Sequence, residues 1–206
     1  MKQPINGYTE IPGSWCKILR AVQVMCPEAI IAGGAIRETL LGHPELIKDL
    51  DIFVNAYGER RDSLEPWLRD IGWTKLAGQE FTADYGRSVM RGEVHRVVGY
   101  DVPGFDLPVQ VIYLTIGEFS PMRAIERMDF FACQLATDGT WLWSTLEALE
   151  DITNRMITMR RPDNMVQFRR SERRAARLRG KFTGTGVSVV SRWPDPVAKF
   201  NLGDCA

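Results

Sequence analysis

The sequence has little of what zinc-binding and membrane proteins usually carry. Its 206 residues include only two histidines and four cysteines, and these show no metal-ligand spacing, so a structural zinc site is not expected. Scattered cysteines favour a reducing compartment. No apolar run approaches the roughly 18 residues that a membrane span needs, and the polar beginning of the chain does not resemble a signal peptide. These absences predict a cytoplasmic protein without a membrane partner.

A net charge is also lacking, because 26 basic residues balance 26 acidic ones, but the charges are unevenly placed. Between Arg155 and Lys181 there are ten Lys or Arg residues and only Asp163 and Glu172 against them. That segment carries +8 and the rest of the chain −8. A basic segment beside an acidic body is typical of a polyanion-binding surface near a carboxylate site. A solvated helix face gives the same pattern, and both interpretations stay open here.

Hydrophobic periodicity predicts an irregular alternation of helices and strands. The predicted helices cover about 14–25, 35–42, 60–71, 145–155 and 164–180, and the predicted strands lie at 29–32, at 49–55 and within 73–144. This order fits an α+β fold in which a mixed sheet has helices on one side, and it does not fit a regularly alternating parallel sheet. The Gly-, Ser- and Pro-containing end of the chain, from residue 183, is expected to be irregular.

The segment from residue 30 to 54 combines two patterns that suit a nucleotide and a metal. Gly33 and Gly34 stand between a strand and a helix, where free backbone N–H groups and the helix dipole favour an anion. Asp49 and Asp51 are one residue apart in a strand, so their side chains can share one face. Paired carboxylates suit Mg²⁺, and two such ions roughly 4 Å apart can assist phosphoryl transfer. Each pattern alone is common, and together they predict nucleotidyl transfer.

The same segment resembles the signature of the class II tRNA nucleotidyltransferases and bacterial poly(A) polymerases, in the DNA polymerase beta superfamily. That family carries Gly-Gly-x-Val-Arg-Asp, then Leu-Leu-Gly, then Asp-x-Asp, and Glu38 stands at the position of its first Asp. The matching residues are Gly33, Gly34, Ile36, Arg37, Leu40, Leu41, Gly42, Asp49 and Asp51. The resemblance covers about 14–182 and implies a nucleotidyltransferase head domain at 1–160. A basic helix similar to the start of the family's neck and an irregular tail follow at 161–206.

A second stretch, ERMDFFACQLATD, resembles the family's Arg-Arg-Asp-Phe-Thr-x-Asn-Ala stretch, which contacts the ribose of the incoming nucleotide. It places Arg127, Asp129 and Phe130 on matching positions. The resemblance therefore implies that Arg127 and Asp129 position the nucleotide, beside the Gly33 and Gly34 backbone. Arg37, on the helix after the glycines, is expected either to bind phosphate or to form a structural ion pair.

The basic helix also has two interpretations. If it closes the nucleotide cleft, Arg174 is expected to bind the triphosphate, and the RNA-binding residues are Arg169, Arg170, Arg173 and Arg177. Otherwise it is a solvated helix.

Three features depart from the family pattern. The family's third carboxylate lies on a later strand, where this chain has Gln110, a neutral amide that is a poor Mg²⁺ ligand and cannot act as a base. Asp106 has the same strand parity and is the candidate substitute. Cys133 stands in place of the ribose-contacting Asn. The sequence also shows no counterpart of the family's base-reading neck motif or tRNA-holding body, so CCA addition is not expected.

Two functions follow from these residues. The first is a nucleotidyltransferase that moves a nucleoside monophosphate from an NTP to an acceptor hydroxyl, with catalytic residues Asp49, Asp51 and Asp106. Mg²⁺ or Mn²⁺ is expected on Asp49 and Asp51, and an RNA 3′ end is the expected acceptor, with a protein side chain or small molecule as alternatives. The second is a catalytically impaired relative that binds a nucleotide, an RNA or a protein, and Gln110 favours it.

Overall fold

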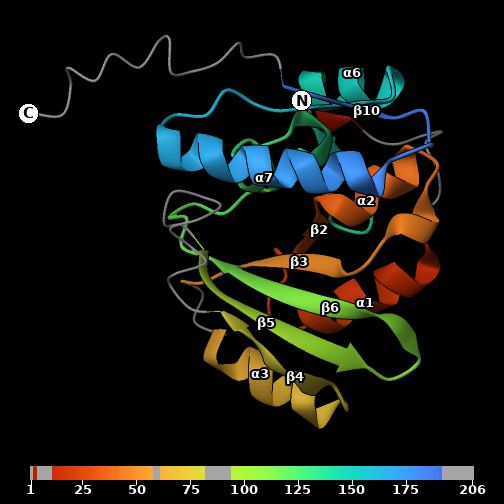
Figure 1. The fold of residues 1–206 in the computed structure, drawn as a ribbon. Coiled ribbons are helices and arrows are strands. Elements are labelled where there is room, and N and C mark those ends of the chain that lie inside the picture. Colours follow the sequence, from red (N-terminus) through yellow and green to blue (C-terminus); the bar gives the residue numbers. More distant parts are fainter. Residues whose placement is uncertain (1, 4–10, 58–60, 82–93, 192–206) are drawn as a thin grey trace, which may run out of the picture.

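The chain folds around one mixed β-sheet (Figure 1). The computed structural model describes residues 2–3, 11–57, 61–81 and 94–191. In this part of the chain the sheet has eight strands in the order β1-β8-β7-β2-β3-β6-β5-β4. The strands are β1 (Lys2–Gln3), β2 (Ile30–Ala32), β3 (Leu50–Asn55), β4 (Thr74–Phe81), β5 (Val94–Val102), β6 (Phe105–Leu114), β7 (Leu135–Thr137) and β8 (Leu142–Ser144).

Strands β3 and β6 pair in parallel at the centre of the sheet, and the other described neighbours pair antiparallel. A second, two-stranded parallel sheet is formed by β9 (Met156–Thr158) and β10 (Ser188–Val190). The helices are α1 (Gly13–Gln23), α2 (Gly34–Leu40), α3 (Arg61–Asp70), α5 (Pro121–Ile125), α6 (Leu146–Thr153) and α7 (Met165–Lys181), with short 3₁₀ turns at Pro44–Leu46 and Phe131–Cys133. The predicted helices and strands are therefore confirmed, with ends shifted by a few residues.

Helices cover both faces of the sheet because its central strands are buried on both sides. All three residues of β2 are fully buried, and β3 sends Ile52 to one face and Phe53 to the other. On the Ile52 face, α1 and α3 contribute fully buried residues such as Leu19 and Leu64. On the Phe53 face, α5 and α7 pack instead. The predicted α+β class and mixed sheet are confirmed, and the helices, expected on one side, lie on both.

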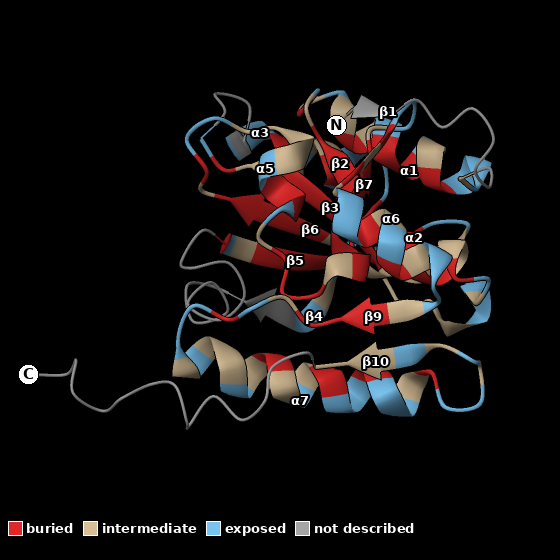
Figure 2. Cartoon of the chain, turned by 90° about the horizontal axis from the view of Figure 1, so that it is seen from above, coloured by how far each residue is buried: buried red, intermediate tan, exposed pale blue. Residues whose placement is uncertain are grey.

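The arginine-rich helix α7 packs along the body of the molecule. Its N-terminus is capped by Asn164, whose side-chain oxygen accepts a hydrogen bond from the backbone N–H of Gln167 at 2.9 Å. Ser171, Ala175 and Leu178 form its buried side, at the spacing of one helix face. Figure 2 shows α7 lying beside β10, with its buried residues turned toward the rest of the molecule. The helix predicted at 164–180 is thus an integral part of the core.

The end of the chain contains one element that its composition does not predict. Residues from 183 onward were expected to be irregular, but β10 forms there and pairs with β9. The residues from 192 to the end lie outside the described part of the chain. The division into 1–160 and 161–206 stays a prediction. Among the described helices, none is both long and apolar enough to cross a membrane.

Candidate active site

Asp49 and Asp51 lie at the start of β3, close to the turn between β2 and α2. Leu50, between them, is fully buried on the face covered by α1 and α3, so alternation turns the two aspartates to the opposite face. A Cβ atom placed on Gly33 would lie 3.9 Å from Oδ2 of Asp51. The structure thus sets the Asp51 carboxylate directly against the glycine turn.

Gln110 fills the position beside the pair on the neighbouring strand. The parallel register of β3 and β6 puts Gln110 next to Asp51, and Nε2 of Gln110 donates a hydrogen bond of 3.0 Å to Oδ2 of Asp49. Asp106, the predicted substitute acid, is exposed near the start of β6, four residues earlier. Among the described residues it has no hydrogen bond or ion pair with either aspartate. Four residues along a strand are roughly 13 Å, and the predicted catalytic role of Asp106 stays a prediction.

The two carboxylates concentrate negative charge. Within the described part of the chain, neither Asp49 nor Asp51 forms an ion pair with a basic residue. Burial, followed by the nearby charge of Asp49, raises the pKa of Asp51 from 3.8 to about 7, and Arg174 acts in the opposite direction. Burial also raises the pKa of Asp49, against the effect of Lys181. Both shifts have the cause expected for two acids that share a desolvated site.

Two basic residues of α7 border the aspartates without pairing with them. Nη1 of Arg174 lies 2.6 Å from Oδ1 of Asp129, and the Ser171 hydroxyl donates a hydrogen bond of 3.3 Å to Oδ2 of the same carboxylate. Seven residues further along α7, Nζ of Lys181 lies 2.7 Å from Oε1 of Glu38. Seven residues are about two helical turns, so both cations project from similar sides of α7. Asp129 and Glu38 hold these cations in place next to the aspartate pair.

Arg37 is a buried residue with internal partners. It is 4% exposed, pairs with Glu38, and donates from Nη1 to Sγ of Cys133 at 2.6 Å. Its guanidinium also lies over the Phe182 ring, 5.8 Å from the centroid. These contacts are those of a structural ion pair, one of the two roles that the sequence left open. The predicted role of Arg37 in nucleotide binding stays a prediction.

The glycine turn is only partly available to a ligand. Gly33 has φ +86°, which favours glycine, and its N–H donates to the Leu135 carbonyl at 3.1 Å. The expectation that both glycine N–H groups are free is therefore wrong for Gly33, because the sheet uses that donor. A Cβ on Gly34 would lie 3.3 Å from Oε2 of Glu38. The absence of a Cβ at Gly34 thus leaves room for the Glu38 carboxylate.

The remaining predicted arginines separate into two groups by exposure. Arg169, Arg173 and Arg177 recur every four residues on α7 and are all exposed, so they form one basic stripe. Arg170 is half-buried and lies one turn before Arg174, on the side that faces the aspartates. Arg127, predicted to contact the sugar, is half-buried.

Sequence reasoning missed two features of this site. One is the ion pair between Glu38 and Lys181, whose partners are 143 residues apart. The other is the hydrogen bond from Gln110 to Asp49, which shows that the amide contacts the acids and does not merely stand near them. The pattern of charges along α7 signals a basic helix, but it does not indicate which cations face inward.

Comparison with solved structures assigns the fold. A tRNA-processing enzyme in its apo form matches with 19% identity and a TM-score of 0.59, over 88% of this chain and 45% of its own. The CCA-adding enzyme of Bacillus stearothermophilus in complex with CTP matches with 18% identity and a TM-score of 0.57, over 87% and 42%. The Thermotoga maritima CCA-adding enzyme complexed with tRNA_CCA matches with 15% identity and a TM-score of 0.57, over 88% and 40%. This chain has the nucleotidyltransferase head fold.

The match to the nucleotidyltransferase head fold is one of structure. No protein-family model matches the chain, and no curated protein matches it in sequence. The chain spans less than half the length of each of these three proteins. The fold implied by the resemblance at residues 32–54 is confirmed. The roles of the individual site residues stay predictions.

The raised pKa of Asp51 predicts a decrease in stability as the pH rises. Between pH 3.8 and about 7 the native side chain keeps a proton that the unfolded chain has released. The free energy of unfolding therefore falls with rising pH across this interval. We expect Asp51→Asn, which cannot ionise, to gain at least about 1 kcal/mol relative to the wild type between pH 5 and pH 8.

Urea unfolding of both proteins at several pH values measures this difference. Asp101→Asn, on the exposed part of β5, is the matched control and is expected to follow the wild type. If the free energy of unfolding changed with pH in the same way in the wild type and in Asp51→Asn, the raised pKa of Asp51 would be contradicted.

Proposed function

We propose that the protein is a metal-dependent nucleotidyltransferase that transfers a nucleoside monophosphate from an NTP to an acceptor hydroxyl. The observation that carries this proposal is the carboxylate pair of Asp49 and Asp51, half-buried beside the glycine turn without an ion pair to a described cation. An acid pair with a structural role alone would be expected to have such a partner, because two carboxylates withdrawn from water and held close together disfavour being charged.

The donor atoms fit a magnesium or manganese ion. Mg²⁺ commonly takes one or two protein carboxylates and completes its shell with water and substrate phosphates. In the described residues no cluster of three or more His, Cys, Asp or Glu forms a self-contained metal cage, so Asp49 and Asp51 would hold the ion together with the substrate. When bound, the ion would neutralise phosphate oxygens and lower the pKa of the attacking hydroxyl.

The cations of α7 suit the triphosphate. Arg174 and Lys181 lie close enough to oppose the pKa shifts of Asp51 and Asp49. In the transfer, the acceptor hydroxyl would lose its proton to solvent and its oxygen would bond to the α-phosphorus. The bond from the α-phosphorus to the oxygen that bridges it to the β-phosphorus would break, so negative charge grows on the leaving pyrophosphate. Arg174 and Lys181 would stabilise this charge, since cations placed beforehand need no reorganisation. Arg127 and Asp129 would position the ribose, as the family resemblance implies.

An RNA 3′ end is the acceptor that we propose. The exposed stripe of Arg169, Arg173 and Arg177 continues along the same helix that carries Arg174 and Lys181 past the aspartates. An RNA backbone on this stripe would lead its end toward the site. Solved structures with the same fold are described as complexes with CTP and with tRNA, which supports an NTP and an RNA as the partners here.

Gln110 supports a second candidate function, a binding protein that does not catalyse. Its Nε2 donates to Asp49 where the related enzymes would be expected to present an acid. An amide cannot take a proton from the acceptor hydroxyl and adds no negative charge for a cation. In this case the chain would bind an NTP, an RNA or a protein without transferring a nucleotide.

A transfer assay separates the two candidates. The protein is incubated with each labelled NTP, Mg²⁺ or Mn²⁺ and total RNA, and the label is followed on RNA, on protein and on small molecules. We expect labelled RNA with the wild type and a loss of at least about 100-fold with Asp49→Asn or Asp51→Asn, because either change removes a metal-binding carboxylate.

Gln110→Glu restores a carboxylate where the related family has its third one, and Gln110→Ala is its matched control. We expect Gln110→Glu to increase transfer or metal affinity, because it adds a third carboxylate, and Gln110→Ala not to do so. If the label appeared on protein or on a small molecule and not on RNA, the acceptor would not be the proposed RNA 3′ end. Stabilisation by NTP and Mg²⁺ with no label on any acceptor would favour the binding protein instead.

The basic stripe makes a separate prediction about RNA affinity. Changing Arg169, Arg173 and Arg177 together to Gln is expected to weaken RNA binding and to reduce the slope of log affinity against log salt by about two to three. Fluorescence anisotropy at several salt concentrations measures both. Glu172→Gln, on the same helix, is the control and should not weaken binding. An unchanged salt slope in the triple variant would exclude the stripe as the RNA surface.

A further inference from the structure

The Glu38 carboxylate pairs with two cations through one oxygen. Oε1 of Glu38 forms an ion pair with the guanidinium of Arg37 and another with Nζ of Lys181, the latter at 2.7 Å. The Glu38 side chain is 1% exposed, so both pairs are withdrawn from water at this oxygen. Burial raises the pKa of Cys133, the other hydrogen-bond partner of Arg37, and this thiol stays neutral. These four side chains therefore carry two positive charges and one negative charge.

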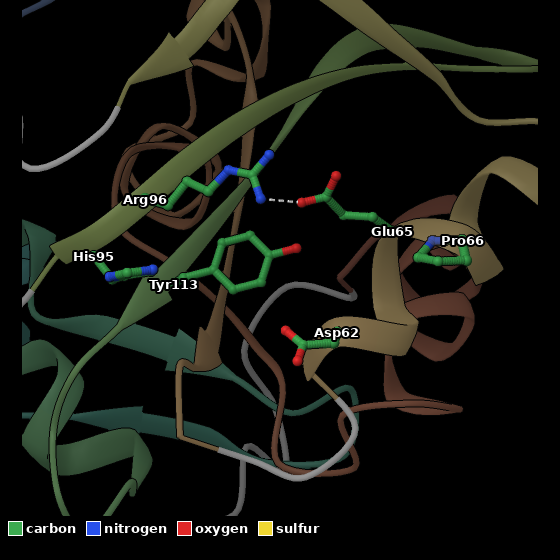
Figure 3. Close-up of a pocket in the computed structure, with 6 residues that line it drawn as sticks. All are labelled: Asp62, Glu65, Pro66, His95, Arg96 and Tyr113. Carbon is green, nitrogen blue, oxygen red and sulfur yellow. Dashed lines mark hydrogen bonds and ion pairs between the residues drawn. The ribbon is translucent and has the colours of Figure 1, made fainter.

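A second carboxylate with two cations lacks this surplus of positive charge. Glu65 forms ion pairs with Arg96 and with Lys75, and it lines a polar cavity between α3 and the β5–β6 hairpin. Asp62 adds a second carboxylate to the same cavity (Figure 3). Two acids thus balance two cations there. The surplus cation is a property of the Glu38 group, which lies beside the aspartate pair.

Lys181 is the cation of the Glu38 group that can exchange its partner. Arg37 is 4% exposed and is held by its ion pair, by the thiol of Cys133 and by the ring of Phe182. Lys181 is 19% exposed, and Glu38 is its one hydrogen-bonded partner among the described residues. A lysine ammonium sits on a flexible four-carbon stem and can turn to a new acceptor. Arg37 would still neutralise Glu38 after such a move.

The backbone at Lys181 is anchored, so that its side chain can move alone. The next residue, Phe182, is 2% exposed, and its ring packs edge-on against His43 with the centroids 6.1 Å apart. The N–H of Phe182 donates to the Leu178 carbonyl at 2.9 Å. The end of α7 is therefore fixed to the body of the molecule on both sides of the lysine.

Lys181 and Arg174 are placed to reach different ends of a nucleotide. They are seven residues apart on α7, which is roughly 10 Å along the helix. Arg174 pairs with Asp129, the residue proposed above for the ribose. Burial raises the pKa of Asp49, and Lys181 is the charge that opposes this rise most. Arg174 thus marks the sugar end of the site, and Lys181 marks the other end, where the last phosphate of an NTP would lie.

We propose that Lys181 selects nucleoside triphosphates over diphosphates, by leaving Glu38 and donating to the terminal phosphate. This assignment rests on the nucleotidyltransferase function proposed above. The ammonium exchanges one anionic acceptor for another, and its charge-assisted hydrogen bond is kept. A diphosphate ends one phosphate earlier, so the ammonium stays on Glu38 and adds nothing to its binding. The two inward cations of α7 therefore have different roles, and Lys181 reads the length of the phosphate chain.

Calorimetric titration of the full chain in the presence of Mg²⁺ tests this role, with each of the four NTPs compared with its matching NDP. We expect the wild type to bind at least one NTP about tenfold more tightly than its NDP. Lys181→Met removes the charge and is expected to lower the NTP affinity about tenfold and to leave the NDP affinity nearly unchanged. Lys181→Arg keeps the charge and should retain most of the preference.

Arg179→Met is the matched control, because it removes an exposed cation from the same end of α7. It should keep the wild-type preference for the triphosphate. Urea unfolding of Lys181→Met should give a midpoint near that of the wild type, since Arg37 still neutralises Glu38. An unchanged preference in Lys181→Met, an equal loss of NTP and NDP affinity, or a midpoint far below that of the wild type would each overturn the proposal.

The titrations also separate this proposal from the proposed function. If the wild type bound none of the NTPs, both would fail. If the wild type transferred a nucleotide but Lys181→Met kept the preference for the triphosphate, only the role of Lys181 would fail. If the preference were lost in Lys181→Met and no nucleotide were transferred by the wild type, the role of Lys181 would stand and the enzymatic function would fail.

Discussion

The placement of Asp49 and Asp51 together in a partly desolvated site is the constraint on which the rest of the site depends. Burial, followed by repulsion from the charge of Asp49, raises the pKa of Asp51 to about 7, so the two carboxylates disfavour being charged together. A structural role would relieve this repulsion with an arginine or lysine. The structure instead directs Arg174 to Asp129 and Lys181 to Glu38. The pair is thus left without a described cationic partner, as the proposed metal site requires.

Helix α7 gives the site its balance of charge. Its apolar side joins the core of the sheet, so its two inward cations stay at fixed positions beside the aspartates. Their ion pairs with Asp129 and Glu38 are largely buried, and such pairs contribute position more than stability. A triphosphate that arrived with its metal could attract the same two cations. The helix that carries them also carries the exposed arginines, so one element would connect the proposed nucleotide binding to the proposed RNA binding.

The sequence predicts the parts of this molecule that local chemistry determines. The strand–glycine–helix–strand order around Asp49 and Asp51, the central sheet and the basic helix all follow from spacing and residue type. Contacts between distant segments do not, because no local pattern encodes the 143-residue separation of Glu38 and Lys181 or the use of the Gly33 N–H by Leu135. The β-bulge at His95 in β5 could not be predicted for the same reason, because its pairing with the partner strand β6 defines it.

Crystallographic location of Mn²⁺ in the presence of a non-hydrolysable NTP analogue tests the central claim most directly. The account predicts an anomalous peak bound by both Asp49 and Asp51, with nucleotide phosphates near Arg174 and Lys181. It is contradicted if the ion is absent from the pair at saturating concentration, or if the two cations have moved onto the carboxylates and closed the site.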